Sequence, residues 1–322
     1  MSRYSVWLCL ACAVLLLMSG RAAANGNIGA IGVSVSDLGN PYFVEIAKGV
    51  EEKAREIAGD DVQVYVESSA YDLQRQIRQV DSFIDRGVDM IILSAADAVA
   101  IEPAVRRAQR AGIKVIAVDV DARGADATVT TDNHQAGEIA CRYMVKRLGG
   151  RGKVAIINGP PVTAAIDRVA GCEEVLSRYP HVKLLSDRQN GGGSQQGGLE
   201  KMTDLLTAYP DIDAVFAIND PTSMGAELAA RQARRDDFFI VSVDAAPRVQ
   251  KRLERGDTLI AGSSAQYPDR MAHRAVEIGA RLIRGERVQP RVIRIPARFI
   301  TSANVDSYAG WGGSAPTLQP GD

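Results

Sequence analysis

The fold is set by a stretch at residues 28–57, which reads IGAIGVSVSDLGNPYFVEIAKGVEEKAREI. Its first part, residues 28–35, is rich in β-branched side chains and predicts a buried strand. Asn40 can cap the helix that Pro41 opens, and apolar residues recur along that helix every three to four positions. A strand followed by an amphipathic helix is the repeating unit of a parallel sheet covered by helices.

The same unit recurs along most of the chain. Further strands are expected at residues 62–66, 90–93, 114–118, 154–157, 182–185, 214–218 and 240–243. The segments between them have helical periodicity. Two successive series of these units, with a break near residues 127–131, contain too many strands for one compact α/β layer. The sequence therefore predicts an α/β fold with two lobes, each built on a parallel sheet.

The amino-terminal segment, residues 1–24, differs in composition from the rest of the chain. Arg3 provides a positive charge, residues 6–18 are apolar, and three alanines at residues 22–24 fit a cleavage site. The apolar run of about 13 residues is shorter than the roughly 20 residues that span a bilayer. We therefore expect a cleaved signal peptide and an exported protein, rather than a membrane anchor.

Charge and composition exclude several classes of function. The chain has 38 Lys and Arg against 39 Asp and Glu, so it lacks the basic excess that nucleic-acid binding requires. His134, His181 and His273 are scattered and form no metal-binding motif. The glycine-rich stretch at residues 190–198 lacks the spacing of a dinucleotide-binding turn. We expect no catalytic residue, no metal and no cofactor.

Two of the four cysteines, Cys141 and Cys172, lie outside the predicted signal peptide. In an oxidising compartment they can form a disulfide, but the sequence does not show whether their Cα atoms lie within the roughly 4.4 to 6.8 Å that a disulfide requires. The pairing therefore stays open at this point. From residue 306 onward, glycine and proline replace the apolar periodicity, which predicts a disordered tail at residues 306–322.

Polar side chains follow the predicted strands where each one ends. They are Asn40, Ser94, Asp119, Asn158, Asn219 with Asp220, Asp244 and Gln266. The carboxyl ends of parallel strands form the ligand crevice of doubly wound sheets, and amides and carboxylates can each engage two neighbouring hydroxyls. For any one of these residues taken alone, helix capping is the favoured explanation. The whole series favours a neutral, polyhydroxylated ligand.

Two aromatic residues and one arginine are further candidates for contact with the ligand. Tyr42 and Phe43 stand at the expected crevice, where an aromatic face can pack against the C–H face of a sugar ring; one of the two is expected in the core. Arg168 begins a predicted helix and can bind two hydroxyls at once. An ion pair with Asp167 or Glu173 at the surface is an equal alternative.

Several short segments of the sequence are typical of one family. They are Gly39-Asn40-Pro41-Tyr42-Phe43-Val44, Val118-Asp119, Thr131-Asp132-Asn133, AYPDIDAVFAIND at residues 208–220, Gln266-Tyr267-Pro268-Asp269 and Arg284-Gly285-Glu286-Arg287-Val288. Over residues 28–305 the chain resembles the ribose-binding group of type I periplasmic binding proteins. The resemblance implies a monomer with two flavodoxin-like lobes joined by a three-strand hinge. The expected lobes are residues 27–131 plus 267–293 and residues 132–266 plus 294–305.

The resemblance also implies a function and a set of site residues. The lobes would close on a monosaccharide or sugar alcohol and deliver it to the permease of an ABC importer; a chemoreceptor is a further partner that the family allows. Ligand positions fall on Asn40, Tyr42, Phe43, Asp119, Arg168, Asn219, Asp244 and Gln266. Ser94 joins them where the ribose binders have an asparagine.

Two other positions depart from the ribose binders. Val120 replaces a second arginine and Gly193 an aromatic residue, so another pentose, a hexose, a furanose or a sugar alcohol is expected in place of ribopyranose. Asp121 would point to the same side as Asp119 if the strand continued.

Three other classes of protein remain as alternatives. The same lobes can serve a sensing module that passes ligand occupancy to a membrane receptor or kinase. A repressor core is disfavoured because the predicted export segment stands where a DNA-binding helix-turn-helix would lie. A sugar hydrolase would need two carboxylates at a defined separation, which a sequence does not reveal.

Overall fold

The computed structural model describes residues 28–312, so the predicted signal peptide lies outside the described residues. The elements are β1 (Ala30–Val35), α2 (Pro41–Ala58), β2 (Gln63–Ser68), α3 (Leu73–Asp85), β3 (Met90–Leu93), α4 (Glu102–Arg110), β4 (Lys114–Val118), β5 (Ala127–Thr131), α5 (Asn133–Arg147), β6 (Gly152–Asn158), α6 (Thr163–Ser177), β7 (Val182–Asn190), α7 (Gln195–Ala208), β8 (Ala214–Ala217), α8 (Asp220–Gln232), β9 (Phe239–Asp244), α9 (Pro247–Arg255), β10 (Ile260–Ala265), α10 (Pro268–Ile283), β11 (Val292–Ile295), β12 (Arg298–Ile300) and the 3₁₀ helix η1 (Val305–Ser307). Within this part of the chain, no helix is both long and apolar enough to cross a bilayer.

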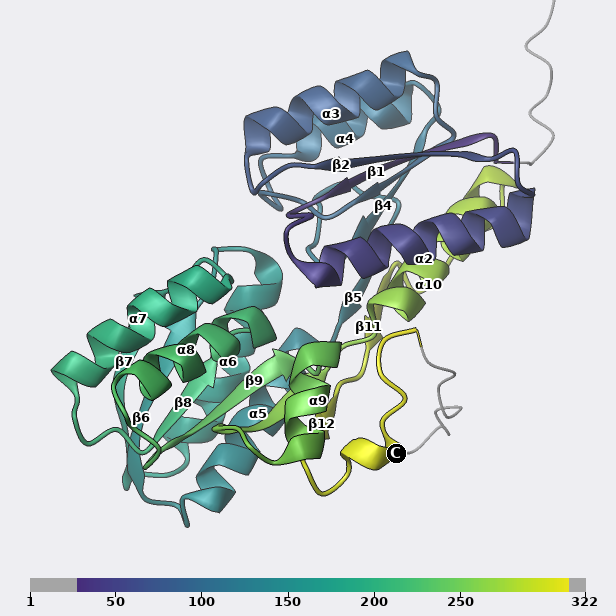
Figure 1. The fold of residues 1–322 in the computed structure, drawn as a ribbon. Coiled ribbons are helices and arrows are strands. Elements are labelled where there is room, and N and C mark those ends of the chain that lie inside the picture. The colour runs from purple at the N-terminus through teal and green to yellow at the C-terminus, as the bar shows by residue number, and fades with distance from the viewer. Residues whose placement is uncertain (1–27, 313–322) are drawn as a thin grey trace, which may run out of the picture.

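The chain forms two lobes, each built on a six-stranded sheet (Figure 1). The strand order is β11-β5-β4-β3-β1-β2 in the first lobe and β12-β10-β9-β8-β6-β7 in the second. Neighbouring strands are parallel except for β10 and β12. In each sheet the first five strands follow the order 2-1-3-4-5 of flavodoxin-like folds. The predicted fold class is confirmed.

Helices cover both faces of each sheet, as the alternating pattern predicts. In the first lobe α2 packs against α10, and α3 packs against α4; in the second, α5 packs against α6 and α7 against α8. Strands β3 and β8 are buried along their whole length, which explains their continuous apolar sequences. Asn40 caps α2 as expected, because its side chain accepts a hydrogen bond from the Tyr42 amide at 3.0 Å.

The chain passes between the lobes three times. It leaves the first sheet after β5, returns after β10 and crosses again between β11 and β12. The first two crossings follow Thr131 and Ala265, close to the expected positions. The third lies beyond the expected boundary at residue 293, because residues up to Ile295 still pair with β5.

The prediction of disorder from residue 306 is wrong for residues 306–312. Tyr308 is buried and Trp311 is partly buried. Both rings pack against other aromatic rings, Tyr308 against Tyr267 and Trp311 against Tyr42. The glycine and proline content of this segment predicts disorder. Composition alone does not show that the rings of Tyr308 and Trp311 pack against other aromatic rings. The rest of the predicted tail, residues 313–322, lies outside the described residues.

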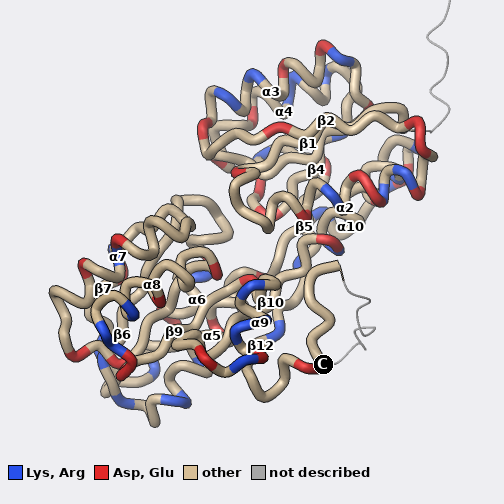
Figure 2. Tube along the Cα trace, in the orientation of Figure 1, with Lys and Arg blue, Asp and Glu red and all other residues tan. Residues whose placement is uncertain are grey.

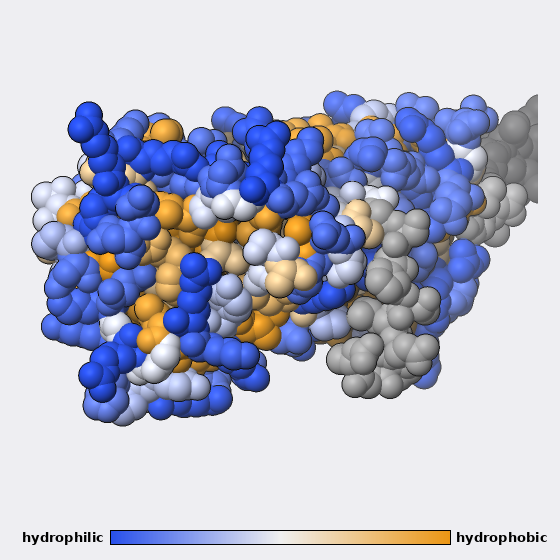
Figure 3. Space-filling view, turned by 60° about the horizontal axis from the view of Figure 1, so that its bottom comes forward, coloured by the Kyte–Doolittle hydropathy of each residue, from blue (hydrophilic) through white to orange (hydrophobic). Residues whose placement is uncertain are grey.

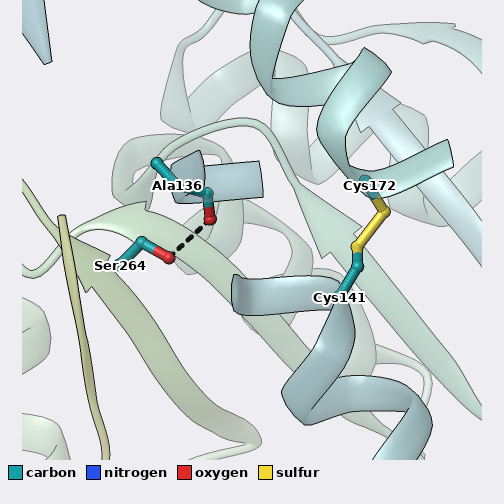
Figure 4. Close-up of a disulfide and its surroundings, with 4 residues drawn as sticks. All are labelled: Ala136, Cys141, Cys172 and Ser264. Carbon is teal, nitrogen blue, oxygen red and sulfur yellow. Dashed lines mark hydrogen bonds between the residues drawn. A yellow bond between two sulfur atoms is a disulfide. The ribbon is translucent and has the colours of Figure 1, made fainter. Parts of the chain in front are cut away.

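Cys141 of α5 and Cys172 of α6 form a disulfide, with their Cα atoms 5.1 Å apart (Figure 4). The two helices approach closely at Gly137 and Gly171, where a β-carbon would overlap the backbone of the opposite helix. The pairing left open by the sequence is therefore resolved. The glycines and the disulfide together hold α5 against α6.

The surface carries both signs of charge. Lys and Arg alternate with Asp and Glu over the outer helices of both lobes (Figure 2). Polar residues cover most of the face drawn in Figure 3, with smaller apolar areas between them. This distribution of charge over the described residues agrees with the balanced composition of the chain.

Candidate functional site

Residues from both lobes line one cavity between them. Its empty space is about 430 Å³, a volume that includes the part that opens to solvent. The lining consists of Asn40, Tyr42, Phe43, Tyr71, Asp119, Pro160, Val162, Ala164, Ala165, Arg168, Gly193, Ile218, Asn219, Asp244 and Gln266. Every ligand residue expected from the sequence lines this cavity except Ser94.

Ser94 belongs to the core of the first lobe instead. It is fully buried, and its Oγ lies 3.0 Å from the Oγ of Ser36. Its backbone carbonyl accepts a hydrogen bond from Gln76 Nε2 at 2.8 Å. A serine side chain is too short to extend past these partners, so the structure does not bring Ser94 into the cavity.

In the first lobe, Tyr42 and Asp119 form a polar wall. Tyr42 Oη lies 3.1 Å from Asp119 Oδ1 and 3.3 Å from Gln266 Oε1, so its single hydrogen can bind one of these acceptors at a time. Asp119 is buried, with φ of 62°. Burial raises the pKa of the Asp119 carboxyl, and the charge of Arg168 opposes this effect.

In the second lobe, Arg168 is buried and held in place on several sides. Its Nε donates to Asn133 Oδ1 at 2.8 Å, and its Nη1 donates to the Ile218 carbonyl at 3.1 Å. Its ion-pair partner is Asp244, with Nη1 3.9 Å from Oδ1. A surface ion pair with Asp167 or Glu173 is therefore excluded for this guanidinium. Its other N–H groups can reach a ligand in the cavity.

Asp244 lies at the end of β9 in a strained loop. Its φ is 130°, and that of Ala245 is 47°; such conformations are sparsely populated and concentrate at functional sites. Gln266 Nε2 donates to Asp244 Oδ1 at 2.7 Å, and the Asp220 amide donates to Asp244 Oδ2 at 3.2 Å. These contacts fix the direction of the Asp244 carboxyl.

The side chain of Asp220 makes hydrogen bonds that hold the same loop in place. Its carboxylate accepts hydrogen bonds from the hydroxyls of Ser242 and Ser263, and from the Ala246 amide at 2.7 Å. Burial raises the pKa of Asp220, and the neighbouring charge of Asp244 raises it further. Asp220 thus acts on the cavity through the position of Asp244.

Asn219 both caps a helix and lines the cavity. Its Oδ1 accepts from the Thr222 amide at 3.0 Å at the start of α8, and its Nδ2 donates to the Gly193 carbonyl at 2.9 Å. The capping explanation for this strand-end residue therefore holds together with its place in the cavity wall. The same is true of Asn40 at the start of α2.

Two other strand-end residues turn away from the cavity. Asp121 accepts hydrogen bonds from Thr128 Oγ1 at 2.7 Å and from the Ala122 amide at 2.9 Å, so its carboxylate serves its own loop. Asn158 Oδ1 accepts from the Gly159 amide at 2.8 Å. Neither residue lines the cavity.

Sequence reasoning missed Tyr71 and the apolar part of the wall. Tyr71 follows β2 with φ of 58° and lines the cavity. The strand-end argument would have found it if it had included the end of β2. Pro160, Val162, Ala164, Ala165 and Ile218 carry no polar signal, so only the folded chain shows them beside a ligand space.

Comparison with known proteins assigns the chain to a family. A family profile described as a periplasmic binding protein domain matches residues 31–287. The chain belongs to the periplasmic binding protein family. The ribose import binding protein of Salmonella typhimurium is 31% identical over 284 residues, which cover 87% of this chain and 93% of the relative. The xylitol-binding protein of Mycolicibacterium smegmatis is 30% identical over 89% of this chain and 81% of its own.

Solved structures agree with this assignment. An ABC transporter solute binding protein from Burkholderia graminis, in complex with D-arabinose, is 26% identical. It superposes with a TM-score of 0.80 over 88% of this chain and 99% of its own. The resemblance to type I periplasmic binding proteins is therefore confirmed.

The cavity of this periplasmic binding protein offers groups for binding. Carboxylates, a guanidinium and amides present hydrogen-bond donors and acceptors to a small ligand. Among the described residues, no cluster of three or more His, Cys, Asp or Glu side chains could hold a metal ion. Its curated relatives are binding proteins.

Asp119→Asn is predicted to stabilise the ligand-free protein while weakening ligand binding. Asparagine tolerates the left-handed backbone at this position. The raised pKa of Asp119 gives stability that is present at low pH and is lost as the pH rises through that pKa. The melting temperature of the variant should therefore exceed that of the wild type by an amount that grows as the pH rises above about 4 and becomes constant above the raised pKa of Asp119.

Asp121→Asn is the matched control. It changes an exposed carboxylate in the same loop, and the Asp121 side chain does not line the cavity. Its melting temperature and ligand affinity should follow those of the wild type at each pH. A lower melting temperature for Asp119→Asn than for the wild type at about pH 8 would contradict the argument.

Proposed function

We propose that this protein captures a monosaccharide or sugar alcohol by closure of its two lobes and delivers it to an ABC importer. The observation that carries the proposal is the position of the buried Asp119 on one lobe opposite the buried Arg168 and Asp244 on the other, around one cavity. Such groups bind hydroxyls through charge-assisted hydrogen bonds. Relatives named for ribose import and for xylitol binding support a hydroxyl-rich, uncharged ligand.

The proposed contacts are strong enough for tight binding. A hydrogen bond to a charged group contributes about 1.5 to 3 kcal/mol, and micromolar affinity corresponds to about 8 kcal/mol. A few bonds from Asp119, Arg168 and Asp244 reach that value. Because these residues lie on opposite lobes, the ligand binds the closed form better than an open one, and this difference drives closure.

The wall opposite the aromatic residues favours a ligand other than ribopyranose. Gly193, where the ribose binders have an aromatic side chain, lines the cavity without filling it. Val120, where they have a second arginine, is buried outside the cavity lining. The cavity wall therefore lacks one ring and one guanidinium that the ribose binders have, which suits a different sugar or an open-chain polyol.

The proposal includes export. A signal peptide at residues 1–24 would direct the chain to the periplasm and be cleaved there. The disulfide between Cys141 and Cys172 supports an oxidising compartment. The permease of an ABC importer would then take the ligand from the closed protein, and a chemoreceptor could recognise the same form.

Calorimetry of the mature chain against pentoses, hexoses and polyols tests the proposal. We expect one site with micromolar affinity for a member of this panel, a melting temperature that rises with ligand concentration, and recovery of the ligand unchanged. The absence of binding across the panel, or the recovery of a reaction product, would refute it.

Uptake of the labelled ligand by cells separates import from sensing. Deleting the gene should abolish uptake at low ligand concentration if the protein serves an importer. Unchanged uptake, together with loss of a ligand-induced transcriptional response, would support the sensing module instead.

A further inference from the structure

The carboxyl-terminal segment of the described chain, residues 305–312, is anchored on the second lobe and runs toward the first (Figure 1, yellow). Tyr308 is buried, and its ring centroid lies 6.5 Å from that of Tyr267. Its backbone carbonyl accepts a hydrogen bond from Gln250 Nε2 of α9 at 3.4 Å. The segment therefore has a fixed starting point beside α9.

Trp311, at the end of this segment, contacts both lobes. Its ring meets the ring of Tyr42 edge-on, with centroids 5.7 Å apart, and it packs against the apolar core of the first lobe. Its Nε1 donates a hydrogen bond to the backbone carbonyl of Asp244, in the second lobe, at 3.1 Å. Tyr42 and Asp244 both line the cavity. One side chain thus joins opposite walls of the candidate site.

The local backbone directs Trp311 into this position. Gly310 has φ of 75°, a conformation that favours glycine, and a β-carbon there would lie 2.9 Å from Gln250 Oε1. The chain can therefore turn tightly against α9 and place the indole between the lobes.

Trp311 also forms a wall of the wider, outer part of the cleft. This outer cavity shares Asn40, Gly193 and Asp244 with the inner cavity and is lined in addition by Pro41 and Trp311. The indole therefore lies where the space around the inner cavity opens outward.

We propose that Trp311 is a ligand-retaining residue that stabilises the closed cleft. This inference rests on the proposed function and adds a side chain outside the inner cavity to the ligand site. Separating the lobes moves Tyr42 away from Asp244, so the ring contact or the hydrogen bond must break on opening. Because both contacts exist together only in the closed form, they shift the equilibrium toward it and slow ligand release.

Substitution of Trp311 tests the proposal through the ligand dissociation rate, measured by stopped flow. Trp311→Ala removes the aromatic pair and the hydrogen bond and should speed dissociation by about tenfold or more. Trp311→Phe retains a ring against Tyr42 without the N–H group and should give an intermediate rate. A dissociation rate for Trp311→Ala equal to that of the wild type would overturn the proposal.

Tyr308→Phe is the matched control in the same segment. The Tyr308 hydroxyl is buried without a hydrogen-bond partner among the described residues, so its removal should leave the dissociation rate unchanged. A faster rate for this variant, equal to that of Trp311→Ala, would show that any change in the segment has the effect and would contradict a specific role for the indole.

Small-angle X-ray scattering of the ligand-free protein separates this inference from the proposed function. The ligand-free Trp311→Ala variant should have a larger radius of gyration than the ligand-free wild type. This comparison does not depend on which ligand the protein binds. If the wild type binds no sugar or polyol, the proposed function fails while the scattering comparison still decides the role of Trp311. Sugar binding with identical scattering curves for the two proteins would refute only the role of Trp311.

Discussion

Arg168→Ala is expected to weaken ligand binding by about a hundredfold. The substitution removes the only arginine among the residues that line the cavity and leaves the buried carboxylate of Asp244 without its ion-pair partner. Arg168 is held in advance by Asn133 and the Ile218 carbonyl, so ligand binding need not order it. Preorganised, charge-assisted contacts of this kind contribute more than neutral ones. Calorimetric titration with the ligand found in the panel measures the loss.

Two further variants make this result interpretable. Arg178→Ala removes an exposed arginine at the carboxyl end of α6, where it pairs with Glu174, and should bind like the wild type. Arg168→Lys keeps the charge but loses the planar fork, so its affinity should lie between those of the wild type and Arg168→Ala. Circular dichroism shows whether each variant is folded. A folded Arg168→Ala variant with wild-type affinity would contradict the site assignment.

Loss of the disulfide is expected to lower stability strongly and affinity weakly. The double substitution Cys141→Ser and Cys172→Ser opens a loop with a sequence separation of 31 residues. For a loop of this size the free energy of unfolding should fall by about 3 to 4 kcal/mol. The close glycine contacts between α5 and α6 remain, as does the Arg168 to Asn133 hydrogen bond, so the cavity wall keeps its shape in the folded variant.

Urea unfolding of the wild type and the double variant, each with and without reducing agent, measures this effect. Reducing agent should destabilise the wild type toward the level of the variant and leave the variant unchanged. Equal unfolding midpoints for the two proteins without reducing agent would contradict a stabilising disulfide. A loss of ligand affinity as large as that of Arg168→Ala would show that the disulfide also positions Arg168.

Much of the fold could be predicted from local patterns. Apolar runs such as Met90–Leu93 predict strands that are buried on both faces, and Asn40 with Pro41 predicts the start of α2. Both signals can be recognised because capping and periodicity act within a few residues. The ends of the hinge and of the ordered tail could not be predicted as well. The length of β11 depends on pairing with the distant β5, and the position of Trp311 depends on Tyr42 and Asp244.

The candidate site was predictable where a polar residue directly follows a strand. Asp119 and Asp244 obey that rule, since parallel strands bring their carboxyl ends together. Ser94 obeys it too, yet its side chain turns to Ser36. A sequence shows that a residue stands at a strand end, but the direction of the side chain follows from neighbours in space. The apolar wall needed the folded chain for the same reason.

The most direct test of the central claim is a crystal structure of the mature protein with the ligand selected by calorimetry. We expect one intact, uncharged sugar or polyol between the closed lobes, within hydrogen-bonding distance of Asp119, Arg168 and Asp244, with Tyr42 or Phe43 against its C–H face. A ligand bound elsewhere on the protein, or one found chemically altered in the cavity, would contradict it.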